Sequence, residues 1–370
     1  MRIAFDYQIF CMQFYGGISR YFVRVAEQLI AKKQDVGIFA PLYINKYAQE
    51  LPYSVVYGRA LNRYPPKSNR IILPLNHVFS KHAIHKWRPQ VLHETYYSRW
   101  SSAPKSCPTV ITIHDMIHEL FRNQFPARDK TTMLKRMAID RANHVICISQ
   151  NTRRDLVDLF GTREEKISVV HLGFEQFDSG FMPTKKYFAL RKPYLLYVGK
   201  REGYKNFSGF VRAVASSSRL KNNFDILAFG GGRFNPSEMS LLSGLGFQSN
   251  QVKQLGGDDT MLGQLYDQAA AFVFPSLYEG FGIPPLEAMA HRCPVVSSNT
   301  SSMPEVIGEA GEYFDPKSID EMAVAIENVV YSPSKTQNLI ELGRKRLNLF
   351  SWENCVDRTL AIYRSLESHV

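Results

Sequence analysis

Long apolar runs and paired cysteines are both missing from this 370-residue sequence. No stretch of about 18 uncharged apolar residues occurs, so we expect no membrane-spanning helix. The opening residues, MRIAFDYQIF, lack the basic region, long apolar run and cleavage site of a signal peptide, and we interpret them as a first β-strand. The five cysteines include no Cys-x-x-Cys pair, so we predict neither a disulfide framework nor a zinc site, and we expect reduced thiols in a cytosol.

Acidic residues are missing between Glu50 and Glu94, where seven cations lie. Together with the formal net charge of +11, this stretch favours an anionic partner. It is either a solvated basic face or a patch that holds the protein against anionic lipid or a diphosphate-linked acceptor. Nucleic acid is not expected, because the sequence has no RNA-recognition signature, zinc-finger spacing or repeated basic–aromatic pattern. The seven cations are Arg59, Arg63, Lys67, Arg70, Lys81, Lys86 and Arg88.

Short apolar runs alternate with helical patterns along both halves of the chain. This alternation predicts an α/β protein with parallel sheets that helices cover on both faces. Residues 175–193 show no sustained periodicity, and we predict a linker there between two doubly wound, Rossmann-like domains at 1–178 and 190–351. Strands are expected to include residues 53–58. Helices are expected at 18–32, 128–142, 152–160, 206–215, 261–268, 285–290, 318–331 and 352–368.

The string SLYEGFGIPPLEAMA, residues 276–290, directly follows a buried apolar strand. In open α/β sheets, ligands bind at the carboxyl ends of the strands. Glu279 and Glu287 are separated by seven residues that include two glycines, which allow close approach of the backbone to a ligand. The prolines at 284–285 suit the first turn of a helix, whose free N–H groups form an anion site. We expect Glu287 in that first turn, within reach of ribose hydroxyls. A capped helix with surface glutamates is the alternative.

This string resembles the signature of the family 4 retaining glycosyltransferases, whose GT-B fold consists of two tandem Rossmann-like domains facing across a cleft. The two glutamates, the E-G-F-G-x-P loop and the E-A-M-A helix start match nearly completely, and the resemblance spans essentially the whole chain. It implies that Glu287 binds the donor ribose and that Glu279 lies by the transferred sugar. It also implies that the loop around Phe281, Gly282 and Ile283 contacts the sugar and the phosphates.

A basic loop follows the strand YLLYVG, which opens the second half. In the family, a glycine at this strand end precedes an arginine and a lysine that hold the diphosphate, and Gly199, Arg201 and Lys205 match them. Two cations are what a diphosphate leaving group needs without a metal, because they stabilise the charge that develops on it. Lys200 stands directly after the glycine, where the family usually has arginine. Lys200 and Arg201 are therefore alternatives for one role. A basic surface turn is the alternative for the loop.

The first half supplies the remaining candidates. Gly16 and Gly17 match the family's glycine loop beneath the donor, and the adjoining Ile-Ser-Arg-Tyr resembles members that act on mannose- or rhamnose-type polysaccharides. His114 ends the strand TVITI, where the family carries a histidine close to the reacting sugar; a buried core histidine is the alternative. Ser149 is interpreted as a helix N-cap. The resemblance also implies that the helix at 352–370 packs back on the first domain.

The resemblance, together with these features, implies a retaining hexosyltransferase that needs no metal and no cofactor and takes a nucleotide sugar as its donor substrate. The sequence has no Asp-x-Asp motif and no convincing metal-binding cluster. Arg201 and Lys205 are expected to stabilise the leaving group, and His114 and Glu279 to hold the sugar. We expect mannose from GDP-mannose and a glycan or diphosphate-lipid-linked acceptor of bacterial surface polysaccharide. We also expect a cytoplasmic protein, peripheral on the inner face of the cytoplasmic membrane.

Several alternatives stay open at this point. The donor is a UDP- or dTDP-sugar in one of them, and in another the chain is a noncatalytic nucleotide-sugar-binding protein. A NAD-type oxidoreductase would need Gly-x-Gly-x-x-Gly after the first strand, which the loop at 16–17 does not supply. A phosphorylase of the same fold would carry a coloured, lysine-linked pyridoxal phosphate. The linkage formed and the oligomeric state are not encoded in any pattern that we identify.

Overall fold

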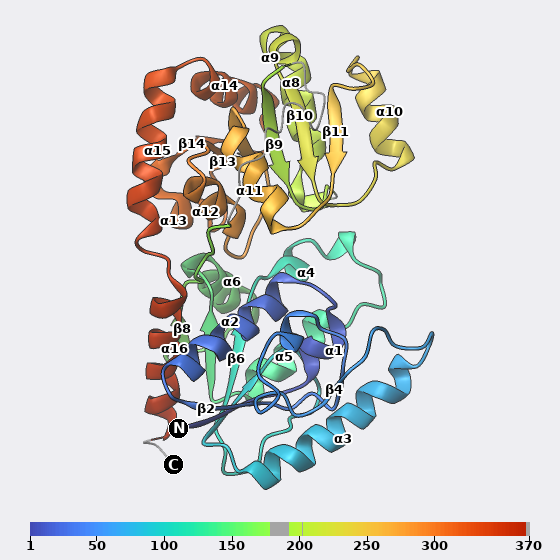
Figure 1. Ribbon diagram of the computed structural model, residues 1–370, viewed down its shortest axis with the longest axis vertical. Helices are drawn as coiled ribbons and strands as arrows, with labels where there is room; N and C mark the ends of the chain where they lie inside the picture. Colours follow the sequence, from blue (N-terminus) through green and yellow to red (C-terminus); the bar gives the residue numbers. More distant parts are fainter. Residues whose placement is uncertain (178–191, 202, 368–370) are drawn as a thin grey trace. The chain divides into compact units, whose positions relative to one another are not determined.

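The computed structural model describes residues 1–177, 192–201 and 203–367. The chain divides into two units (Figure 1). Unit 1 comprises Met1–Gly173 and Ser351–Val370, and unit 2 comprises Phe174–Phe350. Most of the linker expected at 175–193 lies outside the described residues. No helix in the described part of the chain combines the length and the apolar character needed to cross a membrane.

Unit 1 is built on a six-stranded sheet whose strands are all parallel. Along the sheet the order is β2-β1-β5-β6-β7-β8, so the direction of winding reverses between β1 and β5. Such a reversal leaves a crevice at the carboxyl ends of the two strands, where ligands bind in this architecture. The strands are β1 (Arg2–Phe5), β2 (Asp35–Ile38), β5 (Val91–Glu94), β6 (Thr109–Ile113), β7 (His144–Cys147) and β8 (Ile167–Val169).

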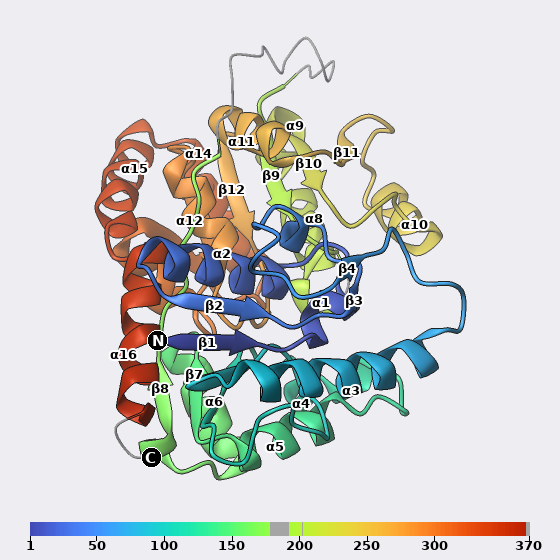
Figure 2. The same ribbon diagram turned by 60° about the horizontal axis from the view of Figure 1, so that its bottom comes forward.

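Helices cover both faces of this sheet (Figure 2). On one face α2 (Gly17–Ala31) packs through Phe22 against Phe5 of β1, with the ring centroids 5.7 Å apart. Helix α16 (Trp352–Glu367) packs against α2 and β5, and the Tyr363 hydroxyl lies 2.5 Å from Nδ1 of buried His93. The other face carries the remaining long helices, α3 (Asn69–Trp87), α5 (Thr131–Arg141) and α6 (Gln150–Phe160).

One expectation for unit 1 is wrong, and one helix was missed. Residues 53–58 form no strand beyond one bridge from Val56 to Ile38, because residues 53–55 form a turn in which the Val55 amide donates to the Pro52 carbonyl at 2.9 Å. The next paired strand is the short β4 (Arg59–Ala60), which pairs with β3 (Leu42–Tyr43). Helix α3 was not expected, since its apolar residues do not form a single stripe. Short helices α1 (Gln8–Met12) and α4 (Ile117–Leu120) complete this part of the unit.

Unit 2 repeats the architecture with a second six-stranded parallel sheet. The order is β11-β10-β9-β12-β13-β14, and the winding reverses between β9 and β12. Its strands are β9 (Tyr194–Val198), β10 (Asp225–Phe229), β11 (Val252–Leu255), β12 (Ala271–Phe274), β13 (Val295–Ser298) and β14 (Gly311–Phe314).

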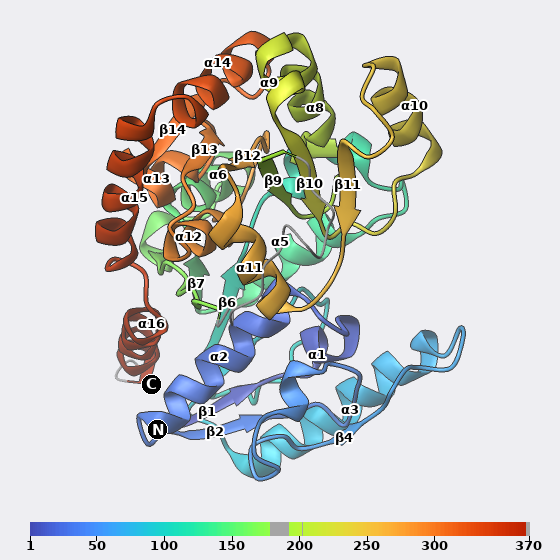
Figure 3. The same cartoon turned by 45° about the horizontal axis from the view of Figure 1, so that its top comes forward.

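The helices of unit 2 pack on both faces of its sheet (Figure 3). Leu195 and Tyr197 of β9 pack in one core with α8 (Phe207–Ser216), α9 (Ser218–Asn223) and α14 (Ile319–Val330). On the opposite face Tyr266 of α11 (Asp259–Gln268) contacts Phe272 of β12, beside α12 (Ile283–Ala290). The remaining helices are α10 (Pro236–Gly244), α13 (Met303–Ile307) and α15 (Pro333–Leu347).

Candidate active site

The carboxyl ends of β9 and β12 lie side by side in the unit 2 sheet, at the point where its winding reverses. Two of the segments that the sequence singled out follow these two strands: the basic loop after β9 and the loop between β12 and α12. The topology therefore brings residues that are far apart in the chain to one edge, in the position where open α/β sheets bind ligands.

Lys205 and Glu279 meet at this edge as an ion pair. The Lys205 Nζ lies 2.7 Å from Oε1 and 3.0 Å from Oε2 of Glu279, so one ammonium group contacts both carboxylate oxygens. The Ser276 hydroxyl also donates to Oε1, at 2.6 Å. Glu279 is buried and Lys205 half-buried, so the pair is only partly screened by solvent.

Backbone contacts fix the basic loop to its neighbour. The Tyr197 hydroxyl donates to the carbonyl oxygens of Lys200 and, at 3.4 Å, of Lys205. The Leu277 amide donates to the Tyr204 carbonyl at 2.7 Å, which ties the two loops directly together. These bonds hold the segment around Lys205 in place from β9 and from the loop after β12.

Serine hydroxyls from the segment after β13 hold the Glu279 loop from the other side. The Ser302 hydroxyl donates to the carbonyls of Glu279, at 2.8 Å, and Phe281, at 2.9 Å. The Ser301 hydroxyl accepts from the Glu279 amide at 3.1 Å. These serine contacts are all to the backbone of the loop.

The start of α12 differs from the expectation. The helix begins at Ile283, immediately after Gly282, whose φ of +104° favours glycine. Glu287 therefore lies in the second turn, and the prediction that it lies in the first turn is wrong. Pro284 and Pro285 carry no N–H, so the amides of Gly282 and Ile283 are the donors that this helix start offers to an anion.

Glu287 contacts a side chain of α11. Its Oε2 accepts from the hydroxyl of buried Tyr266 at 3.3 Å. Burial, followed by the nearby Glu287 charge, raises the pKa of Tyr266 well above its ordinary value, so this hydroxyl stays protonated and donates. Glu287 is itself buried. The phenol thus orients the carboxylate that the family resemblance assigns to the donor ribose.

Arg201 is engaged elsewhere in unit 2. Its Nε lies 2.7 Å from Oε1 of Glu238, and its two terminal nitrogens donate to the carbonyls of Gly230 and Arg233 at 2.9 and 3.1 Å. The guanidinium also lies over the Phe234 ring. The buried arginine thus joins the loop after β9 to the loop after β10, whereas Lys200 is exposed.

In unit 1, Gly16 and Gly17 lie where α2 begins. A Cβ on Gly16 would come within 2.2 Å of Oε1 of Gln13, so a larger residue there would displace the end of the Gln13 side chain. The same oxygen accepts from the Ser19 amide at 3.1 Å, and the Ser19 hydroxyl donates to the Gly16 carbonyl. A Cβ on Gly17 would meet nothing within 4 Å. A side chain at the first glycine would thus disturb the Gln13–Ser19 bond, whereas one at the second would meet no neighbour.

His114 follows β6 at the carboxyl edge of the unit 1 sheet, and its ring packs edge-on to Tyr21 with the centroids 5.2 Å apart. Burial lowers its pKa to about 4; Asp115 raises it and Lys135 lowers it further. The ring is therefore neutral at pH 7. Its Nε2 is buried and has no hydrogen-bond partner among the described residues. A buried nitrogen without a partner is costly, so this atom is suited to bond a ligand.

The sequence analysis missed a polar cluster at the β1–β5 reversal of unit 1. Asp6 accepts from the Thr95 hydroxyl and amide at 2.6 and 2.9 Å and from the Gln8 side chain at 2.6 Å. It also missed Glu238, the partner of Arg201, although Asn-Pro-Ser-Glu at 235–238 is a readable capping box, which α10 does form. Ser149 was interpreted correctly: it caps α6 by accepting from the Thr152 amide at 3.0 Å.

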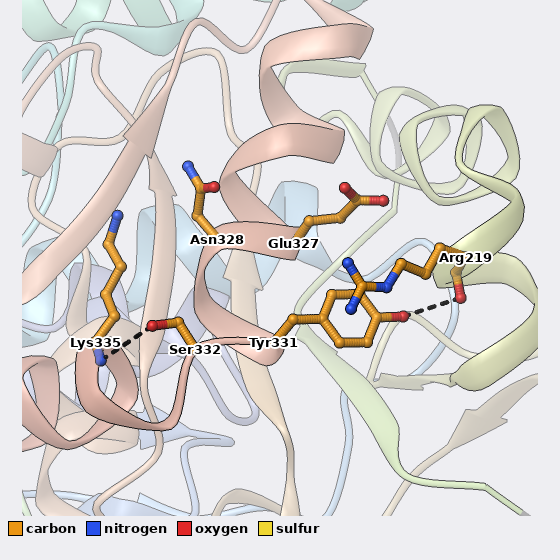
Figure 4. Close-up of a pocket in the computed structure, with 6 residues that line it drawn as sticks. All are labelled: Arg219, Glu327, Asn328, Tyr331, Ser332 and Lys335. Atoms are coloured by element: carbon orange, nitrogen blue, oxygen red, sulfur yellow. Dashed lines mark hydrogen bonds between the residues drawn. The ribbon is translucent and has the colours of Figure 1, made fainter.

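No group of three or more His, Cys, Asp or Glu side chains in the described residues is arranged to hold a metal ion. A hollow of about 430 Å³ lies elsewhere on unit 2, beside α14 and α15 (Figure 4). Its charged side chains have partners: the Arg219 guanidinium lies 3.5 Å from the Tyr331 ring centre, and Lys335 pairs with Glu312, outside the hollow, at 2.6 Å. None of the candidate residues lines this hollow.

Two family models match the chain, one on each half. The model described as "Glycosyltransferase Family 4" matches residues 15–175, and that described as "Glycosyl transferases group 1" matches residues 181–346. Together they cover nearly all of the chain that contains the candidate residues.

Relatives of known activity are glycosyltransferases. The O-antigen chain mannosyltransferase B of Escherichia coli is 29% identical over 274 residues, 70% of either chain. The O-antigen chain mannosyltransferase RfbU of Salmonella typhimurium is 28% identical over 223 residues, 60% of this chain and 61% of the relative. The match to the MMP α-(1→4)-mannosyltransferase of Mycolicibacterium hassiacum, 28% identical, covers 57% of that relative and 64% of this chain.

Solved structures share the fold at low identity. Sucrose-phosphate synthase from Thermosynechococcus elongatus superposes with a TM-score of 0.78 at 20% identity, over 100% of both chains. WaaG, a glycosyltransferase involved in lipopolysaccharide biosynthesis, gives 0.71 at 15% identity, over 98% of this chain and 99% of its own. Each unit is an α/β unit with a parallel sheet, and the signature loop and both family models agree. The chain therefore belongs to the family 4 glycosyltransferases and has the GT-B fold.

Proposed function

We propose that this glycosyltransferase moves mannose from GDP-mannose to a glycan or lipid-linked acceptor of bacterial surface polysaccharide, with retention and without a metal or cofactor. The names of the relatives support mannose and the polysaccharide. The observation that carries the proposal is the Lys205–Glu279 pair at the winding reversal of the unit 2 sheet. It puts a cation and a carboxylate within one hydrogen bond of each other, and we assign the carboxylate to the sugar.

The first task of the site is to let the diphosphate leave. The bond between the anomeric carbon and the phosphate oxygen breaks through an oxocarbenium-like transition state, and negative charge grows on the departing diphosphate. Lys205 and one of Lys200 and Arg201 stabilise this charge, together with the amides of Gly282 and Ile283. Arg201 could bind the diphosphate only by giving up its bonds to Glu238. Exposed Lys200 is therefore the better candidate for the second cation.

The second task is to hold the sugar while the acceptor attacks. Glu279 accepts from a sugar hydroxyl, His114 bonds the sugar through its buried Nε2, and Glu287 binds the donor ribose. The acceptor oxygen bonds to the anomeric carbon on the face that the diphosphate leaves. The acceptor's proton passes to the departing phosphate oxygen, which serves as the base, and positioning supplies much of the rate. A lipid-linked acceptor implies that the enzyme works at the inner face of the cytoplasmic membrane.

A thermal-shift panel tests the donor. A ligand that binds only the folded protein raises the melting temperature, so GDP-mannose should raise it more than UDP-glucose, UDP-galactose or dTDP-rhamnose. The shift should persist in EDTA. The Lys205→Met variant, which keeps the side-chain length and loses the charge, should lose most of the shift and serves as the control for binding at this site.

Two other results would change the assignment. A larger shift with a UDP- or dTDP-sugar would replace the donor, and a shift without detectable transfer or donor hydrolysis would make the chain a binding protein. An equal shift in Lys205→Met would remove the proposed site, and loss of turnover on adding EDTA would end the metal-free mechanism.

A further inference from the structure

Helix α3 of unit 1 has apolar side chains on a buried side and on an exposed side. Ile72 and Ile84 are buried, and Ile84 lies in a core with Ala4 and Leu92 of the sheet. An apolar stripe is exposed: Ile71, Leu75, Val78 and Phe79 have exposed fractions of 66%, 43%, 61% and 59%. Their spacing places them within about 100° of one another around the helix. Exposed apolar side chains that gather in one patch mark an interaction site, whereas single ones do not.

Cations lie on α3 and in the segments of chain on either side of it. All seven cations between Glu50 and Glu94 are exposed. Arg70 and Lys81 lie on α3 at either end of the exposed stripe, and Lys86 lies one turn further on. None of the seven pairs with a carboxylate in the part of the chain that the structure describes, and no acidic residue lies within the stretch. The face therefore combines insertable apolar side chains with uncompensated positive charge.

The geometry points to an anionic lipid bilayer as the occupant of this face, and we propose that α3 docks there. Ile71, Leu75, Val78 and Phe79 enter the boundary between headgroups and acyl chains, and the flanking cations contact lipid phosphates. An apolar stripe bordered by Lys and Arg on a surface helix is the pattern of a helix that lies in the interface plane. Charge complementarity selects the lipid, because a neutral partner would leave the seven cations unmatched.

The position of α3 within unit 1 is consistent with this role. Figure 2 shows the helix along the outside of the unit, with β1 and β2 on its inner side. Ile84 anchors it in a core with Ala4 and Leu92, and the Asn76 side chain bonds both the amide and the carbonyl of Leu42, at 2.7 and 2.9 Å. The exposed stripe makes neither of these contacts, so it can be changed without removing the anchors.

Vesicle flotation tests the proposal with the full chain and with no sugar donor present. The wild type should float with vesicles of equal parts phosphatidylcholine and phosphatidylglycerol, and not with phosphatidylcholine alone. High salt should weaken the association, because part of it is electrostatic. The combined change Leu75→Ser, Val78→Ser and Phe79→Ser should lower the partition coefficient by at least roughly tenfold. Lys81→Glu with Lys86→Glu should do the same, by roughly tenfold.

The matched control makes the same type of change on unit 2. Met239 and Val324 are each 55% exposed, on α10 and α14, and Met239→Ser with Val324→Ser should float like the wild type. Circular dichroism and the melting temperature show whether each variant folds. Should the triple serine variant fail to fold, Phe79→Trp gives a second test: its fluorescence should shift to the blue with anionic vesicles and be quenched by brominated lipid.

Three outcomes would overturn the proposal: a wild type that stays at the bottom with anionic vesicles, equal loss in the unit 2 control, or a wild-type dimer that the triple variant abolishes. The last would make the face a contact between copies of this chain. The proposal deepens the membrane part of the proposed function without resting on the donor. Because the GDP-mannose thermal shift should be unchanged in the triple serine variant, failure of the docking face and failure of the donor assignment are separable.

Discussion

The Lys205 ammonium group spans both carboxylate oxygens of Glu279, at 2.7 and 3.0 Å, although 74 positions separate the two residues in the chain. Without a donor, each charge is neutralised by the other. Under the proposed function, a diphosphate that binds Lys205 must compete with Glu279. The pair would then add a cost to donor binding that a lysine alone would not impose.

Glu279→Gln should separate binding from transfer. Loss of the competing charge frees Lys205, so the dissociation constant for GDP should fall by roughly three- to tenfold. Transfer should fall by roughly a hundredfold, because the sugar loses a charged hydrogen-bond acceptor. Calorimetry with GDP and initial rates measure the two effects. Weaker binding of GDP by this variant would contradict the idea that Glu279 competes with the diphosphate.

Arg201→Ala should lower the stability of the protein, whereas Lys200→Ala should weaken the affinity for the donor. Removing Arg201 leaves Glu238 and two carbonyls without their partner, so we expect a loss of about 3 kcal/mol in the free energy of unfolding. Removing exposed Lys200 should leave stability unchanged and raise the KM for the donor by roughly tenfold. Urea unfolding and donor titration compare them. If Arg201→Lys restores stability and still loses donor affinity, Arg201 contacts the diphosphate after all.

Tyr266→Phe should act on the donor through Glu287. The phenylalanine keeps the ring contact with Phe272 but loses the hydroxyl that bonds the carboxylate. We expect the KM for GDP-mannose to rise by roughly three- to tenfold with kcat nearly unchanged, as for loss of one neutral-to-charged bond that orients a ligand group. Glu287→Gln should raise the KM further. A fall in kcat alone in Tyr266→Phe would indicate that the phenol acts in the chemical step.

His114 should make unit 1 sensitive to acid. Its pKa is about 4 in the folded protein against 6.5 as the ordinary value, so the unfolded chain binds the proton first. The stability that its neutral form contributes is complete above pH 6.5 and is lost as the pH falls toward 4. Between pH 7 and 5 the loss should be about 2 kcal/mol.

The same unfolding series on His114→Gln should remove this part of the pH dependence, while exposed His85→Gln should keep it. Unit 1 also contains buried His93, whose pKa is lowered to about 3 by burial and then by the His114 charge, so some acid sensitivity persists in both variants. An unchanged pH slope in His114→Gln would mean that His114 reaches solvent readily.

The sequence predicts reliably which segments lie near one another. It predicts less reliably which side chains contact one another there. Strand–helix alternation and the two basic and acidic loops are local patterns, so both sheets and the neighbourhood of Lys205 and Glu279 were expected. The ion pair itself was not, because it depends on β9 and β12 becoming neighbours across the reversal of the sheet. Glu287 was placed one turn too early because the pattern does not show that Gly282 ends the loop and Ile283 begins α12.

Partners of buried charges were the hardest to predict. Arg201 looked like a free cation in a basic loop, and only the fold brings Glu238 from the start of α10 beside it. Helix α3 was missed for a different reason: its apolar residues serve two sides, so no single helical stripe stands out. Its buried side includes polar Asn76, which bonds the backbone of β3, and this weakens the stripe further.

Helix α16 makes the first unit discontinuous in the chain. Residues 351–367 pack on a sheet whose strands end at Val169, and Tyr363 bonds His93 inside that unit. Unit 2 is continuous from Phe174 to Phe350. During synthesis, therefore, all residues of unit 2 are made before unit 1 is complete. Until α16 is made, the surface of unit 1 that it covers stays exposed to solvent.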